Sequence, residues 1–205
     1  MGSTSDAQAA GGAAPDVTGS GGSGWQAKVV TVSDGVVAGT RQDRSGPALV
    51  AALGAAGFEV VETVATADGA HRVAAALLRC CDSFSGLVVT TGGTGFGPRD
   101  LTPEGTKTVL DREAPGLAEA MRGCNPLGRL SRGAAGTVGT ALVLNVPGST
   151  RGSVECLEAV LDVLPHALAL MTSHPDRHPS GEPGGPAGGR RGTVGDIAEV
   201  LGNGS

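Results

Sequence analysis

One stretch of the sequence, residues 86–106, most constrains what this chain can fold into. It reads GLVVTTGGTGFGPRDLTPEGT and begins with an apolar, β-branched run, Leu87–Thr91. That run has the length and composition expected of a buried parallel strand. Four glycines follow within six residues: Gly92, Gly93, Gly95 and Gly97. A strand that runs into such a loop can point its backbone N–H groups at a phosphate or a carboxylate.

The end of the same stretch carries an acid and a helix start. Asp100 precedes Thr102-Pro103-Glu104, where we expect Thr102 to be the N-cap and Pro103 the first helical residue. The alternative is a glycine-rich turn without a ligand. The spacing matches neither Walker A, which needs Gly-Lys-Ser/Thr, nor G-x-G-x-x-G. The loop by itself does not decide between an anion site and a turn.

Strands and helices alternate along the rest of the chain. This order predicts a three-layer α/β/α, doubly wound domain with a mostly parallel sheet over residues 25–175. A hairpin is expected within residues 131–140, and Pro165 should kink or interrupt the last helix. The other expected elements are strands at 28–32, 58–66, 86–91 and 141–146, and helices at 45–57, after Asp68, at 102–111, 115–123 and 152–171.

Apolar residues at helical spacing predict which faces of two helices are buried. The predicted inward residues are Leu49, Val50, Leu53 and Ala56 in the first helix, and Val73, Leu77, Leu78 and Cys81 in the second. Both ends of the chain have different compositions. We expect a disordered tail at residues 1–24 and a Pro/Gly-rich tail at 176–205, in which 193–201 forms a short helix that docks or stays loose.

Composition excludes several classes of function. The net charge is −5, and the chain has one Trp, three Phe and no Tyr, so it lacks the cationic face and stacking aromatics of nucleic-acid binders. No apolar run approaches the roughly 20 residues of a membrane span. The N-terminus lacks the pattern of a secretory signal, and we expect a cytoplasmic protein. None of the four cysteines forms C-x-x-C. Reduced thiols are favoured, with a redox role for Cys80-Cys81 as the alternative.

Polar or glycine-rich segments follow four of the predicted strands. They are Ser33-Asp34, Asp68, the 92–100 loop and Pro147-Gly148-Ser149. The carboxyl ends of parallel strands meet at one edge of a sheet, where ligands bind in doubly wound folds. The sequence therefore predicts one site built from these four strand ends.

These segments resemble the molybdopterin-binding family, in particular its molybdopterin adenylyltransferases. The resemblance spans about residues 27–172 and rests on Val32-Ser33-Asp34 with Asp43-Arg44-Ser45-Gly46, on the stretch Thr91 to Glu104, and on Asn145 to Ser149 with Gly152 and Glu155-Cys156. It implies the family's fold, a homotrimer and a reaction. In that reaction, Mg²⁺ and ATP adenylate the phosphate of molybdopterin and pyrophosphate is released. A partner enzyme then inserts molybdate.

The resemblance also implies roles for individual residues. Asp68 and Asp100 would be the catalytic acids and the metal ligands. The nucleotide would bind Gly92, Gly93, Thr94, Gly95, Pro147, Gly148 and Ser149, and the pterin substrate would bind Ser33, Asp34, Arg132 and Arg151. Arg99 and Arg151 are candidate phosphate contacts. Simpler alternatives remain: helix capping for both aspartates, turn geometry for the glycines and for 147–149, a strand end for Ser33-Asp34, and solvated surface charge for the two arginines.

Two positions depart from the family pattern on the pterin side. Many relatives have arginine where this chain has Val138, and proline where it has Thr150. These departures motivate a second hypothesis, a paralogue that binds pterin or nucleotide without turnover. A third is a nucleotide pyrophosphatase on the same fold, related to the competence-damage-inducible family.

Overall fold

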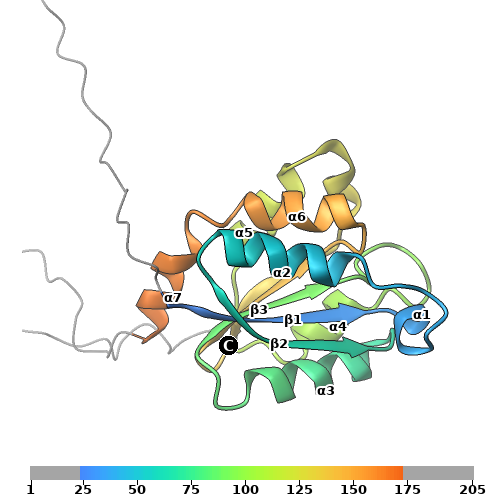
Figure 1. Ribbon diagram of the computed structural model, residues 1–205, viewed down its shortest axis with the longest axis horizontal. Coiled ribbons are helices and arrows are strands. Elements are labelled where there is room, and N and C mark those ends of the chain that lie inside the picture. Colours follow the sequence, from blue (N-terminus) through green and yellow to red (C-terminus); the bar gives the residue numbers. More distant parts are fainter. Residues whose placement is uncertain (1–23, 173–205) are drawn as a thin grey trace, which may run out of the picture. The chain divides into compact units, whose positions relative to one another are not determined.

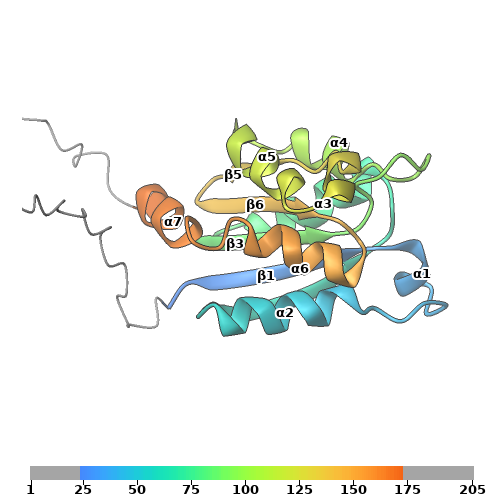
Figure 2. The same ribbon diagram turned by 90° about the horizontal axis from the view of Figure 1, so that it is seen from above.

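A computed structural model describes residues 24–172 as a six-stranded sheet between two layers of helices (Figure 1, Figure 2). The strand order is β2-β1-β3-β6-β5-β4. The first four strands are parallel to one another, and β5 is antiparallel to both of its neighbours, β6 and β4, so the predicted fold class is confirmed. The elements are β1 (Gln26–Val32), α1 (Asp34–Val37), α2 (Ser45–Ala55), β2 (Glu59–Thr66), α3 (Ala70–Cys81), β3 (Gly86–Thr91), α4 (Thr102–Lys107), β4 (Arg112–Glu113), α5 (Pro115–Gly123), the 3-10 helix η1 (Pro126–Leu130), β5 (Ala135–Val138), β6 (Ala141–Val146), α6 (Thr150–Glu158) and α7 (Leu164–Thr172).

Each face of the sheet is covered by its own apolar core. Val29 of β1 packs with Leu53 of α2 in a core that α5, α6 and α7 complete. Val30 points the other way and packs with Val73 of α3. Figure 1 shows α2 and α6 on one side of the sheet and α3 on the other. Because β3 and β6 are buried on both faces, their sequences are mostly apolar rather than alternating, and their polar residues, Thr90, Thr91 and Asn145, are buried as well.

Two of the residues predicted to face inward do not. Leu78 is 54% exposed, because the buried stripe of α3 runs through Val73, Leu77 and Cys81 and Leu78 lies about 100° around the helix from Leu77. Ala56 is exposed because α2 ends one residue before it. The other predicted inward residues of these two helices are buried or half-buried.

Two more of the predicted helices have different bounds. Leu101 is the N-cap of α4, so Thr102 is its first residue and Pro103 its second, and α4 ends at Lys107 because β4 follows. The predicted helix 152–171 is two helices, α6 and α7, separated by residues 159–163. Pro165 is the second residue of α7, where its missing N–H costs no intrahelical hydrogen bond. The predicted interruption is therefore confirmed.

The predicted hairpin at residues 131–140 is only partly within these bounds: its first strand is β5, at 135–138, and its second is β6, at 141–146. β5 pairs with β6, and Gly139 turns the chain between them with φ +56. The short strand β4, which the sequence did not predict, pairs with β5 at the sheet edge. Gly136 is required in that pair, because an added Cβ would lie 2.3 Å from the carbonyl oxygen of Arg112.

The four cysteines are unpaired, as the prediction of reduced thiols requires. Cys80 and Cys81 are both buried on the α3 side of the sheet. Burial raises the pKa of Cys81 to about 12, which keeps this thiol protonated.

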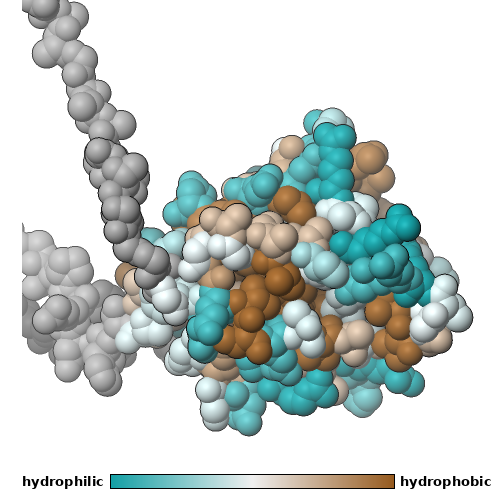
Figure 3. All heavy atoms as spheres, in the orientation of Figure 1, coloured by the Kyte–Doolittle hydropathy of each residue, from teal (hydrophilic) through white to brown (hydrophobic). Residues whose placement is uncertain are grey.

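Within residues 24–172, no helix has the length and apolar character needed to cross a membrane. The predicted tails, apart from Gly24, and the predicted helix at 193–201 lie outside the described residues. β2 is the edge strand nearest the viewer in Figure 1. On that side of the molecule, apolar residues gather beside a small cavity of about 500 Å³ between β2 and α2 (Figure 3).

Asn145 is a buried polar residue that ties β6 to its neighbours. Its Nδ2 donates to the hydroxyls of Thr90 in β3 and Thr106 in α4, both at 2.9 Å. Its Oδ1 accepts from the N–H of Ala134 at 3.1 Å. The amide thereby fixes α4 and the start of the hairpin against the sheet.

We expect Asn145→Ala to destabilise the protein by about 3 kcal/mol, because it removes three hydrogen bonds and leaves buried polar groups without partners. Urea unfolding followed by circular dichroism measures the change. Leu170→Ala, at a side chain that is 64% exposed, is the matched control and should shift stability by less than about 0.5 kcal/mol. Equal effects of the two substitutions would contradict the assigned role of Asn145.

Candidate functional site

The four strand ends predicted from the sequence open into one cavity of about 1150 Å³. Parallel register aligns the ends of the strands: Val32 pairs with Thr66, and Thr91 pairs with Thr31 and Val146. The predicted site residues that line the cavity are Ser33, Asp68, Gly92, Gly93, Thr94, Gly95, Asp100, Pro147, Gly148, Ser149 and Arg151. Two predicted site residues, Asp34 and Arg132, lie outside the lining.

The floor of the cavity is backbone. Gly92 has φ +104, and an added Cβ there would lie 2.3 Å from the carbonyl oxygen of Val32. Gly93 has φ +61, and its Cβ would lie 2.3 Å from Oγ1 of Thr102. From the other wall, the Cβ of residue 148 would come within 3.1 Å of the Cα of Gly92. Turn geometry and close packing therefore both require glycine here, and the result is a surface of main-chain atoms that an anion can approach.

Asp100 closes the glycine loop on itself. Its Oδ2 accepts from the N–H of Gly97 at 2.8 Å, and an added Cβ at Gly95 would lie 2.9 Å from the same oxygen. No side chain caps α4, whose N-cap is Leu101, so the capping alternative for Asp100 is wrong. The carboxylate instead lies beside the loop and at the cavity wall.

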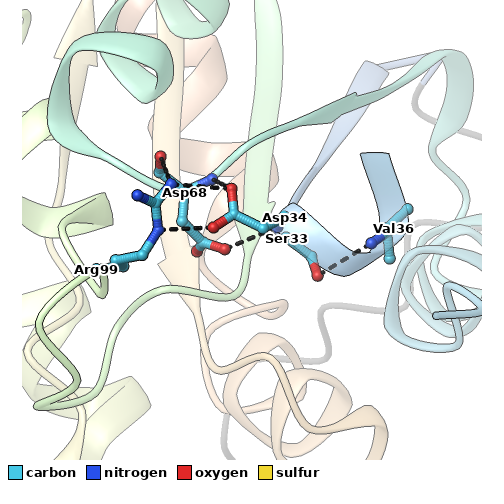
Figure 4. A network of polar contacts seen from close by, with 5 residues as sticks. All are labelled: Ser33, Asp34, Val36, Asp68 and Arg99. Carbon is cyan, nitrogen blue, oxygen red and sulfur yellow. Dashed lines mark hydrogen bonds and ion pairs between the residues drawn. The ribbon is translucent and has the colours of Figure 1, made fainter. Parts of the chain in front are cut away.

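Asp68 and Asp34 bind each other's backbone across the ends of β1 and β2 (Figure 4). The N–H of Asp34 donates to Oδ2 of Asp68 at 2.8 Å, and the N–H of Asp68 donates to Oδ1 of Asp34 at 3.1 Å. The N-cap of α3 is Gly69, without a side-chain cap, so the capping alternative for Asp68 is also wrong. Oδ1 of Asp68 would lie 3.4 Å from a Cβ on Gly93, which places it on the glycine-loop side.

Arg99 forms an ion pair with the carboxylate of Asp34. Its Nε and Nη2 donate to Oδ2 and Oδ1 of Asp34 at 2.6 and 3.0 Å, and Nη2 also donates to the carbonyl oxygen of Asp68 at 3.1 Å (Figure 4). The hydrogen bonds from Arg99 lower the pKa of Asp34 below its ordinary value of 3.8, against a smaller opposing effect of desolvation. Asp34 and Arg99 thus fasten the glycine loop to the ends of β1 and β2.

Arg132 holds the loop from the other side. Its guanidinium donates to the carbonyl oxygens of Gly95, at 2.8 Å, and Asp100, and to the carboxylate of Glu104. Burial alone would raise the pKa of Glu104, but the hydrogen bond and charge of Arg132, the Glu104 backbone N–H and the charge of Lys107 together lower it. The ring of Phe96 lies 5.8 Å from the guanidinium carbon. All of these contacts are made within the protein.

Ser33 and Arg151 line the cavity but have protein partners as well. Ser33 accepts from the N–H of Val36 at 3.3 Å and so caps α1. The side chain of Arg151 is 90% exposed, and its Nε donates to Oε1 of Glu155 at 2.5 Å. That hydrogen bond lowers the pKa of Glu155.

Sequence reasoning missed two groups of lining residues. Asp43 accepts from the hydroxyl of Thr31 at 2.6 Å and from the N–H of Gly46 at 2.9 Å, and so fixes the start of α2 at the cavity. Its signal was present in the segment 43–46. The second group lies at 125–131, around η1, with the exposed side chains of Leu127 and Leu130. Nothing in the pattern of that segment marked it.

The donor set suits a hard cation that is shared with a ligand. Within residues 24–172, no three His, Cys, Asp or Glu side chains are grouped closely enough to hold a metal ion by themselves. Asp68, beside Gly93, and Asp100, beside Gly95, do both line the cavity. Mg²⁺ is commonly held by one or two carboxylates together with substrate phosphates and water. Asp68 and Asp100 are therefore the residues that could hold Mg²⁺ together with a phosphate-bearing ligand.

A family model described as "Probable molybdopterin binding domain" matches residues 28–166. Among curated proteins, the chain is 37% identical over 150 residues to the molybdopterin adenylyltransferase of Helicobacter pylori J99, covering 70% of this chain and 85% of that protein. It is 39% identical over 142 residues to the molybdopterin adenylyltransferase of Escherichia coli K12, covering 65% and 72%. It also matches a molybdenum cofactor biosynthesis bifunctional protein of Synechococcus elongatus at 36% identity, where it spans 51% of that protein.

Solved structures agree with this grouping. The molybdopterin biosynthesis enzyme MoaB of Thermus thermophilus superposes with a TM-score of 0.69 at 44% identity, covering 75% of this chain and 99% of that one. The molybdopterin biosynthesis Mog protein of Mycobacterium ulcerans gives a TM-score of 0.68 at 37% identity, covering 72% and 99%.

The Arg99–Asp34 ion pair predicts a pH-dependent stability difference. Because the folded-state pKa of Asp34 is lowered, the stabilisation is fully present above its ordinary value of 3.8 and is lost as pH falls through the lowered value. We expect Arg99→Ala to lower the melting temperature at neutral pH, and the difference from the wild type to shrink below about pH 3.8. Arg79→Ala, on the exposed side of α3, is the control. A difference that persists unchanged in acid would contradict the ion pair.

Proposed function

Because this chain belongs to the molybdopterin-binding domain family, we propose that it is a molybdopterin adenylyltransferase of molybdenum-cofactor biosynthesis. The support is twofold: relatives of that name at 37% and 39% identity, and a cavity whose residues suit the reaction. In the proposed reaction, an oxygen of the terminal phosphate of molybdopterin attacks the α-phosphorus of ATP. The bond from that phosphorus to the bridging oxygen of the β-phosphate breaks, and pyrophosphate leaves.

The observation that carries the proposal is the cavity itself. It is large, its floor is main-chain atoms, and two carboxylates line it. Pockets for one small ligand usually have about 300–1,000 Å³. At about 1150 Å³, this cavity offers room for two phosphate-bearing substrates at once. The nucleophile belongs to one substrate and the leaving group to the other. The protein therefore has to align the two phosphates and neutralise the charge between them.

We assign the nucleotide phosphates to the floor formed by Gly92 to Gly95, with Pro147 to Ser149 as the facing wall. Asp68 and Asp100 would hold Mg²⁺, which supplies charge neutralisation between the two phosphates when it is bound. Because the Asp68 side chain already accepts from the N–H of Asp34, its position is fixed before the substrates arrive.

The four residues assigned to the pterin substrate divide into two groups. Ser33 and Arg151 line the cavity, and we propose that they contact the substrate directly. Asp34 is paired with Arg99, and Arg132 donates to the glycine loop. We propose that both residues act by positioning this loop.

We further propose that the protein works as a cytoplasmic homotrimer and passes its product to an enzyme that inserts molybdate. The support for the second step is the bifunctional relative, in which a sequence similar to this chain makes up about half of the protein.

The two departures from the family pattern lie in different places. Val138 packs against the core on the α3 side and does not line the cavity, whereas Thr150 does line it. Thr150 is therefore the position that favours the second candidate, a paralogue that binds without turnover.

The deciding experiment supplies the purified full-length protein with molybdopterin, ATP and Mg²⁺ and follows adenylated molybdopterin and pyrophosphate. We expect both products in equal amounts. Tight binding of molybdopterin without either product would favour the silent paralogue. Hydrolysis of ADP-ribose without pterin would favour a pyrophosphatase.

We expect Asp100→Asn to lower turnover by about 100-fold or more, because the neutral amide cannot hold the metal against the phosphates. The melting temperature should stay close to that of the wild type, since the amide oxygen still accepts from Gly97. Asp82→Asn, at an exposed aspartate at the end of α3, should leave turnover unchanged. Full turnover in the Asp100 variant would remove this residue from the catalytic site.

A further inference from the structure

Two cysteines from different helices lie side by side behind the rim of the cavity. Cys124 is the C-cap residue of α5, and Cys156 lies in α6. Their Sγ atoms are 3.3 Å apart. Neither lines the cavity, but Asn125 and Glu155, their immediate neighbours in the sequence, both do.

The thiols form a directed chain of hydrogen bonds. Cys156 donates to the carbonyl oxygen of Met121 at 3.2 Å, so the proton between the two sulfurs comes from Cys124. Nδ2 of Asn125 donates in turn to Sγ of Cys124 at 3.3 Å. The chain therefore runs from Asn125 through Cys124 and Cys156 to Met121.

The same Asn125 organises the rim. Its Nδ2 also donates to Oε2 of Glu155 at 2.8 Å, and its Oδ1 accepts from the N–H of Gly128 in η1 at 2.9 Å. Glu155 in turn accepts from Arg151 at 2.5 Å. One amide therefore joins the thiol pair to η1, Glu155 and Arg151 at the cavity wall.

We propose that Cys124 and Cys156 are a reversible oxidation site, in which a disulfide between them rearranges the Asn125–Glu155 wall and weakens nucleotide binding. A disulfide needs a sulfur–sulfur distance of about 2.05 Å, so the two atoms have to approach by about 1.2 Å. This effect on binding rests on the proposed function, whereas formation of the disulfide does not.

The oxidant is a hydroperoxide. With hydrogen peroxide, the Cys124 sulfur attacks one peroxide oxygen, the O–O bond breaks and water leaves. Cys124 becomes a sulfenic acid. The Cys156 sulfur then attacks that sulfur and displaces a second water. Two thiols lose two protons and two electrons in total, and hydrogen peroxide is reduced to two waters.

Exposure sets the order of these two steps. Cys124 is partly exposed, whereas Cys156 is 1% exposed and burial raises its pKa to about 12. The peroxide therefore meets Cys124 first, and Cys156 resolves the sulfenic acid. Cys80 and Cys81, the alternative pair, are both buried on the opposite face of the sheet.

Oxidation changes the wall because it removes both S–H protons. The carbonyl oxygen of Met121 loses its donor, and the contraction pulls the end of α5 toward α6. Asn125 follows Cys124 in the chain and so moves relative to Glu155.

The first experiment treats the fully reduced, full-length protein with hydrogen peroxide and counts thiols after denaturation. We expect two of the four thiols to be lost, a mass decrease of two hydrogens, a Cys124–Cys156 cross-linked peptide, and full recovery with dithiothreitol. Cys124→Ser and Cys156→Ser should each abolish the cross-link, and Cys80→Ser should retain it. No intramolecular disulfide, or one that contains Cys80 or Cys81, overturns the proposal.

The second experiment measures ATP binding by calorimetry, with Mg²⁺, on the reduced and oxidised forms of each variant. The dissociation constant of the wild type and of Cys80→Ser should rise about fivefold or more on oxidation and return on reduction. That of Cys124→Ser should not change on oxidation. A disulfide without a change in affinity refutes the coupling to the wall. If the reduced protein does not bind ATP, the proposed function fails while the disulfide result stands.

Discussion

Three strand ends converge on Gly92, and the rest of the site depends on that approach. A Cβ on Gly92 would lie 2.3 Å from the carbonyl oxygen of Val32 in β1. The N–H of Gly92 donates to the carbonyl oxygen of Val146 in β6 at 3.2 Å, and a Cβ on Gly148 would lie 3.1 Å from the Cα of Gly92. Because β3 lies between β1 and β6 at the centre of the sheet, the loop leaves from the most constrained part of the fold. A floor of main-chain atoms on that foundation needs little reorganisation to receive an anion.

Three arginines around this floor have different tasks, although they look alike in the sequence. Arg99 fastens the tip of the loop to Asp34, Arg132 holds its carbonyl oxygens from beneath, and Arg151 extends into solvent beside Glu155. A guanidinium with its planar fork can hold several oxygens at once, which suits the first two positions. Two guanidinium groups therefore hold the loop from two sides, through Arg99 itself and through the carbonyl oxygens of Gly95 and Asp100.

The sequence predicted the layers, the four parallel strands and the edge that carries the site, because each of these follows from local patterns. Buried strands read as apolar runs, and glycine clusters mark where side chains cannot fit. The roles of residues whose hydrogen-bond partners are distant in the sequence could not be predicted from local patterns. Asp68 looked like an N-cap until its partner proved to be the N–H of Asp34, at a separation of 34 residues. The rim at 125–131 holds only the short 3-10 helix η1, whose position depends on tertiary contacts such as that of Asn125 with Glu155.

The cavity has a main-chain floor and a side-chain rim, and these two parts differ in how well they tolerate substitution. Under the proposed function, substitutions at the rim, as at Leu127, Leu130 or Thr150, would alter which molecule is recognised without altering how its phosphate is held. Substitutions at the floor are blocked by backbone and by Thr102, so they damage the fold before they can change the ligand. On that proposal, phosphate recognition would be inherited with the fold, and the rim residues would determine which substrate binds.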